Sequence, residues 1–237
     1  MLVVMANCQD AAAHTLVERW AAYGACLLTP DDLSVAGWRY HPGDIQASRA
    51  MVAGCPLDAR DIGAVITRLP WVFEHDLGHI VPADRAYVAA EMNAFLLSWL
   101  TALPCPVLNR PTPTCLSGPY WRQEKWVHIA ARLGIPVTPV RRQSALRMAP
   151  AGFPESPEEG VTVTIIGQGH CGPVDPMLVK QARCLADVAG VDVLSVQFSG
   201  PTPGSCFVSA SLWPDIAADD IADALLTYIQ KGSARCP

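Results

Sequence analysis

Two histidines four residues apart, His75 and His79, are the first residues in the chain whose types and spacing could bind a metal ion. On a helix this spacing would place both imidazoles on one face, as in many zinc sites. Gly78 lies between them and prolines flank the segment, which favours a loop instead. A metal site would therefore need a third ligand such as His170. The competing interpretation is loop histidines that make ordinary hydrogen bonds.

A second candidate is the segment 167–172, which reads G-x-G-x-x-G directly after an apolar run. This pattern can bind the phosphates of a dinucleotide at the N-terminus of a helix. Here Pro173 and Pro176 separate the last glycine from the following helix, and no acidic residue follows the next strand to hold a ribose. We therefore interpret the segment as a glycine-rich turn.

A catalytic nucleophile is not indicated, because the chain has no G-x-S-x-G motif and Cys115, Cys171 and Cys206 have no evident base nearby in sequence. The nine cysteines are scattered and include no C-x-x-C pair. The sequence also opens without the basic region of an export signal. We expect reduced thiols, a cytoplasmic location and no structural zinc site.

Composition excludes several classes of protein. The chain has 237 residues, of which 51% are hydrophobic and 16% charged, so it is too apolar to be disordered. Its net charge of -5 gives no basic surface for nucleic acid. The apolar stretch Phe95–Leu103 is about half the length needed to cross a membrane. We expect neither a nucleic-acid partner nor a membrane.

The elements that must position these residues alternate between strands and helices, which predicts an α/β fold with a mainly parallel sheet in its first part. The segment 143–160 has three prolines and no periodic apolar face, and it reads as a linker. The predicted strands are Leu2–Met5, Ala25–Leu28, Ala64–Leu69, Val107–Asn109, Ile135–Arg141, Val161–Ile166, Val191–Gln197 and Cys206–Ser211. The predicted helices are Ala11–Tyr23, Arg85–Leu103, Tyr120–Leu133, Met177–Val188 and Ile216–Ile229.

The order of several short motifs resembles the ATP-grasp ligases, in the branch of glutathione synthetase and the ribosomal-protein glutamate ligases. These motifs are A-V-I-T-R ending at Arg68, Y-x3-E ending at Glu91, V-L-N-x-P from Val107, Q-x-K ending at Lys125, and L-G-I-P-V-T from Leu133. The segment L-A-D-V-A-G-V-D-V-L from Leu185 resembles a further strand motif of that family. Phe207–Ile216 and the following A-D-D-I-A-D-A-L-L-T-Y resemble its last catalytic strand and closing helix.

The resemblance implies a pre-ATP-grasp parallel-sheet domain at residues 1–112 and a connecting helix and strand at 113–142. After the linker it implies a reduced ATP-grasp-like α+β portion at 161–237.

The sequence departs from the family pattern at positions that the family uses to bind ATP and magnesium. The resemblance implies a lobe with a phosphate-binding lysine and a lid between Val140 and Val161, and here the proline-rich linker stands in its place. Asp192 matches the first magnesium ligand of the family, but Ser209 and Ser211 stand where a glutamate and an asparagine are expected. Neutral hydroxyls are poor ligands for a hard divalent ion that bridges phosphates.

The sequence therefore predicts a degenerate ATP-grasp-like protein that acts as a binding or accessory subunit in peptide or amino-acid modification and needs no cofactor. The alternative is an active ATP-dependent carboxylate–amine ligase that uses Mg-ATP in a minimal lobe built from residues 141–172. A third, weaker alternative is a metal enzyme built on the three histidines. Expected partners are a protein or peptide, including an active ligase, in a homo- or hetero-oligomer. The candidate substrate or nucleotide contacts are Arg68, Glu91, Lys125, Arg141 and Arg142, and Asp192 is a candidate relic of the metal site.

Overall fold

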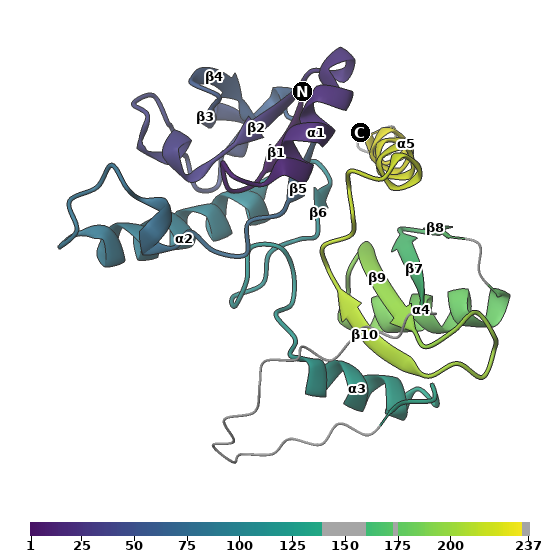
Figure 1. The fold of residues 1–237 in the computed structure, drawn as a ribbon. Helices are drawn as coiled ribbons and strands as arrows, with labels where there is room; N and C mark the ends of the chain where they lie inside the picture. The colour runs from purple at the N-terminus through teal and green to yellow at the C-terminus, as the bar shows by residue number, and fades with distance from the viewer. Residues whose placement is uncertain (139–159, 173–174, 234–237) are drawn as a thin grey trace. The chain divides into compact units, whose positions relative to one another are not determined.

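A computed structural model describes residues 1–138, 160–172 and 175–233 of the chain. The chain divides into two compact units, the first formed by Met1–Tyr120 with Asp215–Pro237 and the second by Trp121–Pro214 (Figure 1). The last helix thus belongs to the N-terminal unit, whereas the sequence pattern had grouped all of 161–237 together.

The first unit contains a four-stranded parallel sheet in the order β2-β1-β5-β6. Its strands are continuous apolar runs, which is the pattern of parallel strands covered on both faces. Val3, Val4 and Val65 are at most 1% exposed. The predicted parallel sheet is confirmed. The bounds are β1 Leu2–Met5, β2 Ala25–Leu28, β5 Ala64–Thr67 and β6 Val107–Leu108.

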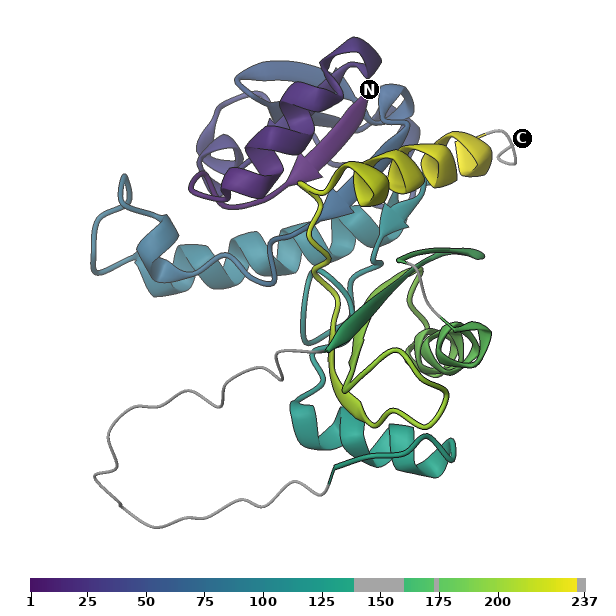
Figure 2. The same ribbon diagram turned by 45° about the vertical axis from the view of Figure 1, so that its right-hand side comes forward.

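Three α-helices complete this unit: α1 (Ala11–Arg19), α2 (Arg85–Ala102) and α5 (Asp219–Ser233) (Figure 2). Asp10 begins α1, because its carboxylate accepts a hydrogen bond from the backbone N–H of Ala13 at 3.1 Å. Leu96, Trp99 and Leu100 of α2 belong to the same buried cluster as side chains of β1, β5 and β6. The unit also has five short 3-10 helices: η1 (Ala21–Tyr23), η2 (Pro30–Ser34), η3 (Ile45–Ala47), η4 (Ala59–Asp61) and η5 (Glu74–Asp76).

A small hairpin of β3 (Arg49–Val52) and β4 (Cys55–Asp58) lies in a stretch where the sequence analysis predicted neither a strand nor a helix. Its two turn residues, Ala53 and Gly54, both have positive φ, at 50° and 73°. Such a turn normally carries Asn-Gly or Asp-Gly, and Pro56 is atypical of a strand. The usual signals of a hairpin are therefore absent from the sequence.

The second unit contains an antiparallel sheet in the order β10-β9-β7-β8. Its elements are α3 (Gln123–Arg132), β7 (Val161–Ile166), β8 (Gly169–Cys171), α4 (Pro176–Ala189), β9 (Val193–Phe198) and β10 (Phe207–Ser211). Trp126 of α3 and Leu178 and Leu185 of α4 are buried in one cluster with the sheet's apolar side chains. The mixed α/β class predicted for the chain is confirmed.

One prediction about this unit is confirmed and another needs refinement. The segment 167–172 is a turn into β8, with Gly167 at φ 54°, so it opens a hairpin and no phosphate-binding helix. The strand predicted over Ile135–Arg141 is reduced to a single bridge between Val137 and Phe207 in the part that is described, and the residues from 139 onward lie outside it. The described residues contain no helix with the length and apolar character needed to cross a membrane.

Candidate functional site

One face of the antiparallel sheet in the second unit carries a cluster of hydroxyl and amide side chains beside the buried Ile166 and Val193. This face contains the positions at which the family resemblance places metal ligands. Alternation along the strands sends Val163, Ile165, Leu194 and Val196 into the core, so their neighbours point to the opposite face. We call this opposite face the hydroxyl face. It consists of Thr162 and Thr164 of β7, Ser195 and Gln197 of β9, and Ser209 and Ser211 of β10.

The strand register brings these side chains into two cross-strand rows. Ser195 stands opposite Thr164 on one side and Ser211 on the other, while Gln197 stands between Thr162 and Ser209. Directly opposed residues of antiparallel strands lie close enough to interact. Accordingly the Thr164 and Ser195 hydroxyl oxygens are 2.8 Å apart, and the Ser209 hydroxyl donates to Gln197 Oε1 at 3.1 Å.

The hydroxyl face is uncharged and largely occupied by its own hydrogen bonds. Ser211 accepts from the backbone N–H of Trp213 at 3.1 Å. Asp192 is the residue before β9, is half-buried, and its backbone carbonyl accepts from Gly167 N–H at 2.7 Å. Among the described residues no group of three His, Cys, Asp or Glu side chains is placed to hold a metal ion. The arrangement supports hydrogen bonding to a neutral polar group rather than tight coordination of a divalent cation.

Lys125 lies near this sheet on α3 and is exposed, but its ammonium group already has an aromatic partner. It stands 4.0 Å from the centroid of the Trp121 ring, which in turn packs against Trp126 at 4.7 Å between centroids. A cation over an indole face is held by the ring quadrupole. Gln123 on the same helix donates to the backbone carbonyl of Val208 in β10. Arg141 and Arg142, the other basic candidates here, lie outside the described residues.

In the first unit, Arg68 follows β5 directly and forms an ion pair with Asp10. The distance from Arg68 Nε to Asp10 Oδ2 is 2.7 Å, and the two side chains are 15% and 19% exposed. Burial raises the pKa of Asp10, but hydrogen bonds from Arg68 and from the Ala13 N–H, with the positive charge of Arg68, lower it by more. The pKa therefore ends below its ordinary value, and Arg68 serves to position the loop after β5. Glu91, on α2, is exposed.

The three candidate metal-binding histidines have separate surroundings. His79 Nδ1 is 3.1 Å from Asp31 Oδ1, and its Nε2 is 2.8 Å from the Ser34 hydroxyl. His75 stacks on Phe73 with the two rings 9° from parallel. His170 lies on β8 in the second unit.

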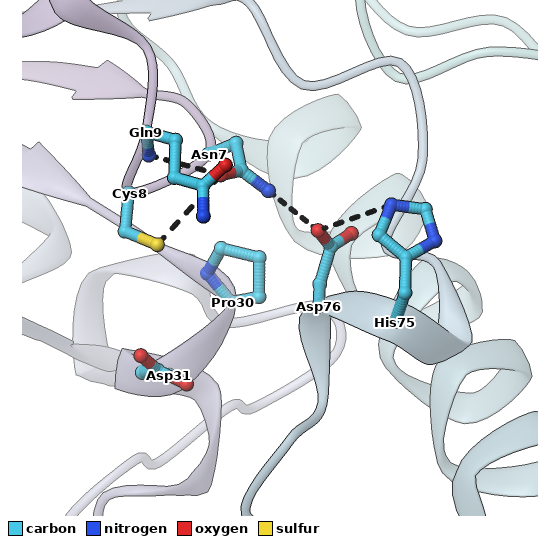
Figure 3. A pocket seen from close by; sticks show the side chains of 7 residues that line it. All are labelled: Asn7, Cys8, Gln9, Pro30, Asp31, His75 and Asp76. Atoms are coloured by element: carbon cyan, nitrogen blue, oxygen red, sulfur yellow. Dashed lines mark hydrogen bonds and ion pairs between the residues drawn. The ribbon is translucent and has the colours of Figure 1, made fainter.

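A pocket that the sequence did not reveal lies at the carboxyl ends of β1, β2 and β5. Loops after these three strands supply its lining residues: Asn7, Cys8, Gln9, Pro30, Asp31, His75 and Asp76 (Figure 3). The strand order reverses between β1 and β5, and this is the place where open α/β sheets bind ligands. We call it the switch-point pocket. No local sequence signal marks it, because its lining residues come from three separate loops.

The similarity of this chain to known proteins lies in its structure. No protein-family model matches the sequence, and neither does any curated protein. Among solved structures, the macrocyclase MdnC from Microcystis aeruginosa MRC, bound with its precursor peptide MdnA, aligns with a TM-score of 0.67 at 10% identity. That alignment covers 97% of this chain and 99% of MdnC.

Two further solved structures have a similar fold. A peptide-associated ATP-grasp ligase from Chryseobacterium gregarium, in complex with ADP and a leader and core peptide, aligns with a TM-score of 0.64 at 9% identity, covering 100% of this chain and 97% of that one. The ATP-grasp ligase PsnB, complexed with a minimal precursor, Mg and ADP, aligns with a TM-score of 0.60 at 12% identity, covering 97% and 98%. The chain therefore has the fold of the ATP-grasp ligases.

Proposed function

We propose that this protein is a peptide-binding accessory protein of peptide modification that keeps the ATP-grasp fold without its nucleotide chemistry. The observation that carries the proposal is the neutral hydroxyl face. Ser209 and Ser211 stand where the family resemblance expects a glutamate and an asparagine, and Ser209 is hydrogen-bonded to its cross-strand neighbour Gln197.

The physical argument concerns charge. A ligase of this type must hold magnesium ions that bridge the phosphates of ATP, and Mg²⁺ at such sites relies on carboxylate oxygens. The hydroxyl face offers none, so Asp192 would be the one carboxylate left from the family's ligand set. Two neutral hydroxyls contribute no negative charge, so they cannot replace the carboxylate that helps to hold Mg²⁺ against the phosphates of ATP. The proposal therefore assigns the site a binding role and no phosphoryl transfer.

The assignment of a peptide as partner draws on the structural neighbours. MdnC was crystallised bound with a precursor peptide, and the Chryseobacterium ligase with a leader and core peptide. A protein with the same fold and a hydrogen-bonding face without charge is suited to hold a peptide backbone or neutral side chains while a partner enzyme performs the ligation.

Two titrations test the proposal. Mg-ATP is added to the purified full chain in a calorimeter, with an active ATP-grasp ligase as the positive control, and we expect no saturable heat at millimolar nucleotide. Precursor peptides encoded beside this protein are titrated by fluorescence anisotropy, and we expect saturable binding. Binding of Mg-ATP with release of ADP on addition of peptide would overturn the proposal.

The alternative function is an active carboxylate–amine ligase with a minimal nucleotide lobe. It is favoured by one observation, namely that Lys125 is an exposed cation beside the sheet on which the resemblance places nucleotide chemistry. In that case Lys125→Met would abolish peptide-dependent ADP formation, whereas Lys180→Met on α4 would not. Under the accessory function neither the native chain nor either variant forms ADP.

A further inference from the structure

The switch-point pocket has the features of a built binding site, and none of its lining residues is among the contacts that the family resemblance suggested. It has a volume of about 110 Å³, which is room for a few water molecules or the end of one side chain. Its walls come from the loops after three parallel strands, so the sheet fixes their relative positions. Figure 3 shows Asn7 and Asp76 pointing toward each other across it.

Asp76 is the central group of this pocket. Its side chain is 3% exposed, and its carboxylate accepts hydrogen bonds from the Phe73 N–H at 2.8 Å and from Asn7 Nδ2. The Asn7 amide is oriented in turn, because its oxygen accepts from Gln9 N–H at 3.0 Å. A carboxylate has about four acceptor positions. Among the described residues its one cationic neighbour within ion-pair distance is His75, whose Nε2 lies 3.7 Å away.

The charge of the pocket adds to this argument. Asp31 lines the same cavity and is 65% exposed, with His79 as its ion-pair partner. The described lining residues include two carboxylates and no lysine or arginine. Arg68, the strong cation at this sheet edge, is paired with Asp10. A buried carboxylate is stable only when its hydrogen-bonding capacity and charge are matched, so the pocket favours a positively charged guest.

We propose that the switch-point pocket binds a small organic cation, the ammonium or guanidinium group of an amine or of a basic side chain. The guest donates to Asp76 at the base of the pocket and to Asp31 at its rim. This inference is independent of the proposed function, because an active ligase with this fold would have the same pocket.

Cys8 provides a local reporter for the test. Its thiol lines the pocket and is exposed, while Cys55, on β4, is also exposed and does not line it. The alkylation rates of both thiols by iodoacetamide are followed on the full chain by peptide mass spectrometry. The probes are N-acetyl-lysine methylamide, N-acetyl-arginine methylamide, methylammonium, and the uncharged N-acetyl-norleucine methylamide.

We expect the cationic probes to slow the alkylation of Cys8 in a saturable manner and to leave Cys55 unchanged. Protection by methylammonium alone would identify free amines as the guests, whereas stronger protection by the amino-acid amides would identify basic residues of a peptide. Equal protection by the norleucine probe, or no protection by any cation at millimolar concentration, would overturn the proposal.

Two carboxylate variants add a second readout. Asp76→Asn and Asp31→Asn should each weaken protection by about ten-fold, the scale of one charge-assisted hydrogen bond, while Asp187→Asn on exposed α4 should leave it unchanged. If Asp76→Asn does not fold, Asp31→Asn still decides the question because Asp31 is exposed at the rim. Unchanged protection in a folded Asp31→Asn variant, or equal weakening in Asp31→Asn and Asp187→Asn, would contradict a site at this pocket.

Discussion

The ion pair between Arg68 and Asp10 offers a sharp test of the structure, because the sequence made Arg68 a candidate ligand contact and gave no sign that it pairs with Asp10. Asp10→Asn removes the charge but keeps a side-chain oxygen to cap α1, since Asn is as good an N-cap as Asp. The matched control is Asp175→Asn at the N-cap of α4, whose side chain accepts from Met177 N–H at 2.7 Å and forms no ion pair with any of the described residues. The difference between the two variants isolates the ion pair.

The expected magnitude follows from the partial burial of the pair. Exposed ion pairs contribute about 0–1 kcal/mol, and breaking a fully buried pair costs about 3–5 kcal/mol. The Arg68 and Asp10 side chains are 15% and 19% exposed, so we expect Asp10→Asn to cost about 2 kcal/mol more than Asp175→Asn. In thermal unfolding followed by circular dichroism this is about 6 °C for a chain of this size.

The pH dependence gives an independent check. Because the pKa of Asp10 is lowered in the folded state, its ionisation stabilises the fold above the unfolded-state value of about 3.9. That contribution is lost as the pH falls through the lower, folded-state pKa. The stability gap between the native chain and Asp10→Asn should therefore be constant near neutrality and shrink in acid. Equal melting temperatures for Asp10→Asn and Asp175→Asn at pH 7 would refute the structural role of Arg68.

Three further variants test other parts of the structure. Leu185→Ala leaves a cavity at a fully buried position in the core of the second unit and should lower the free energy of unfolding in urea by about 2–5 kcal/mol. Val188→Ala, on the exposed side of the same helix, should lower it far less, and similar losses for the two variants would contradict the described core. Thr164→Val keeps the shape of a side chain that is 3% exposed but removes its hydrogen bond with the Ser195 hydroxyl. We expect the free energy of unfolding to fall by about 1 kcal/mol in the same assay. A rise would show that the hydroxyl face is not hydrogen-bonded as described. Glu91→Ala should change stability by less than about 0.5 kcal/mol because the side chain is exposed on α2, and a larger loss in thermal unfolding would reveal a structural contact there.

The regular elements could be predicted because their signals are local. The apolar runs at β1, β5 and β7 and the capping aspartate of α1 are visible in the sequence. The helix predicted to end at Tyr23 is followed by Gly24, whose φ of 69° lies in the left-handed region that ends helices. The glycine-rich segment after β7 was correctly interpreted as a turn, because the prolines that follow it prevent a helix from starting at the last glycine.

Features that depend on distant parts of the chain could not be predicted. The switch-point pocket brings together Asn7, Asp31 and Asp76 from three loops, and only the order of the strands makes them neighbours. The ion pair of Arg68 with Asp10 could not be predicted either, because the family motif that contains Arg68 says nothing of a partner from another loop. The hairpin of β3 and β4 could not be predicted because an alanine occupies the first left-handed position of its turn.

The central claim is that the hydroxyl face cannot hold Mg-ATP, and a calorimetric titration of the purified full chain with Mg-ATP tests it most directly. Ser209 and Ser211 supply hydroxyls where a carboxylate and an amide would be needed, so the account predicts no saturable heat and no rise in melting temperature at millimolar nucleotide. A saturable heat with a matching rise in melting temperature, both dependent on Mg²⁺, would contradict it and favour an active ligase.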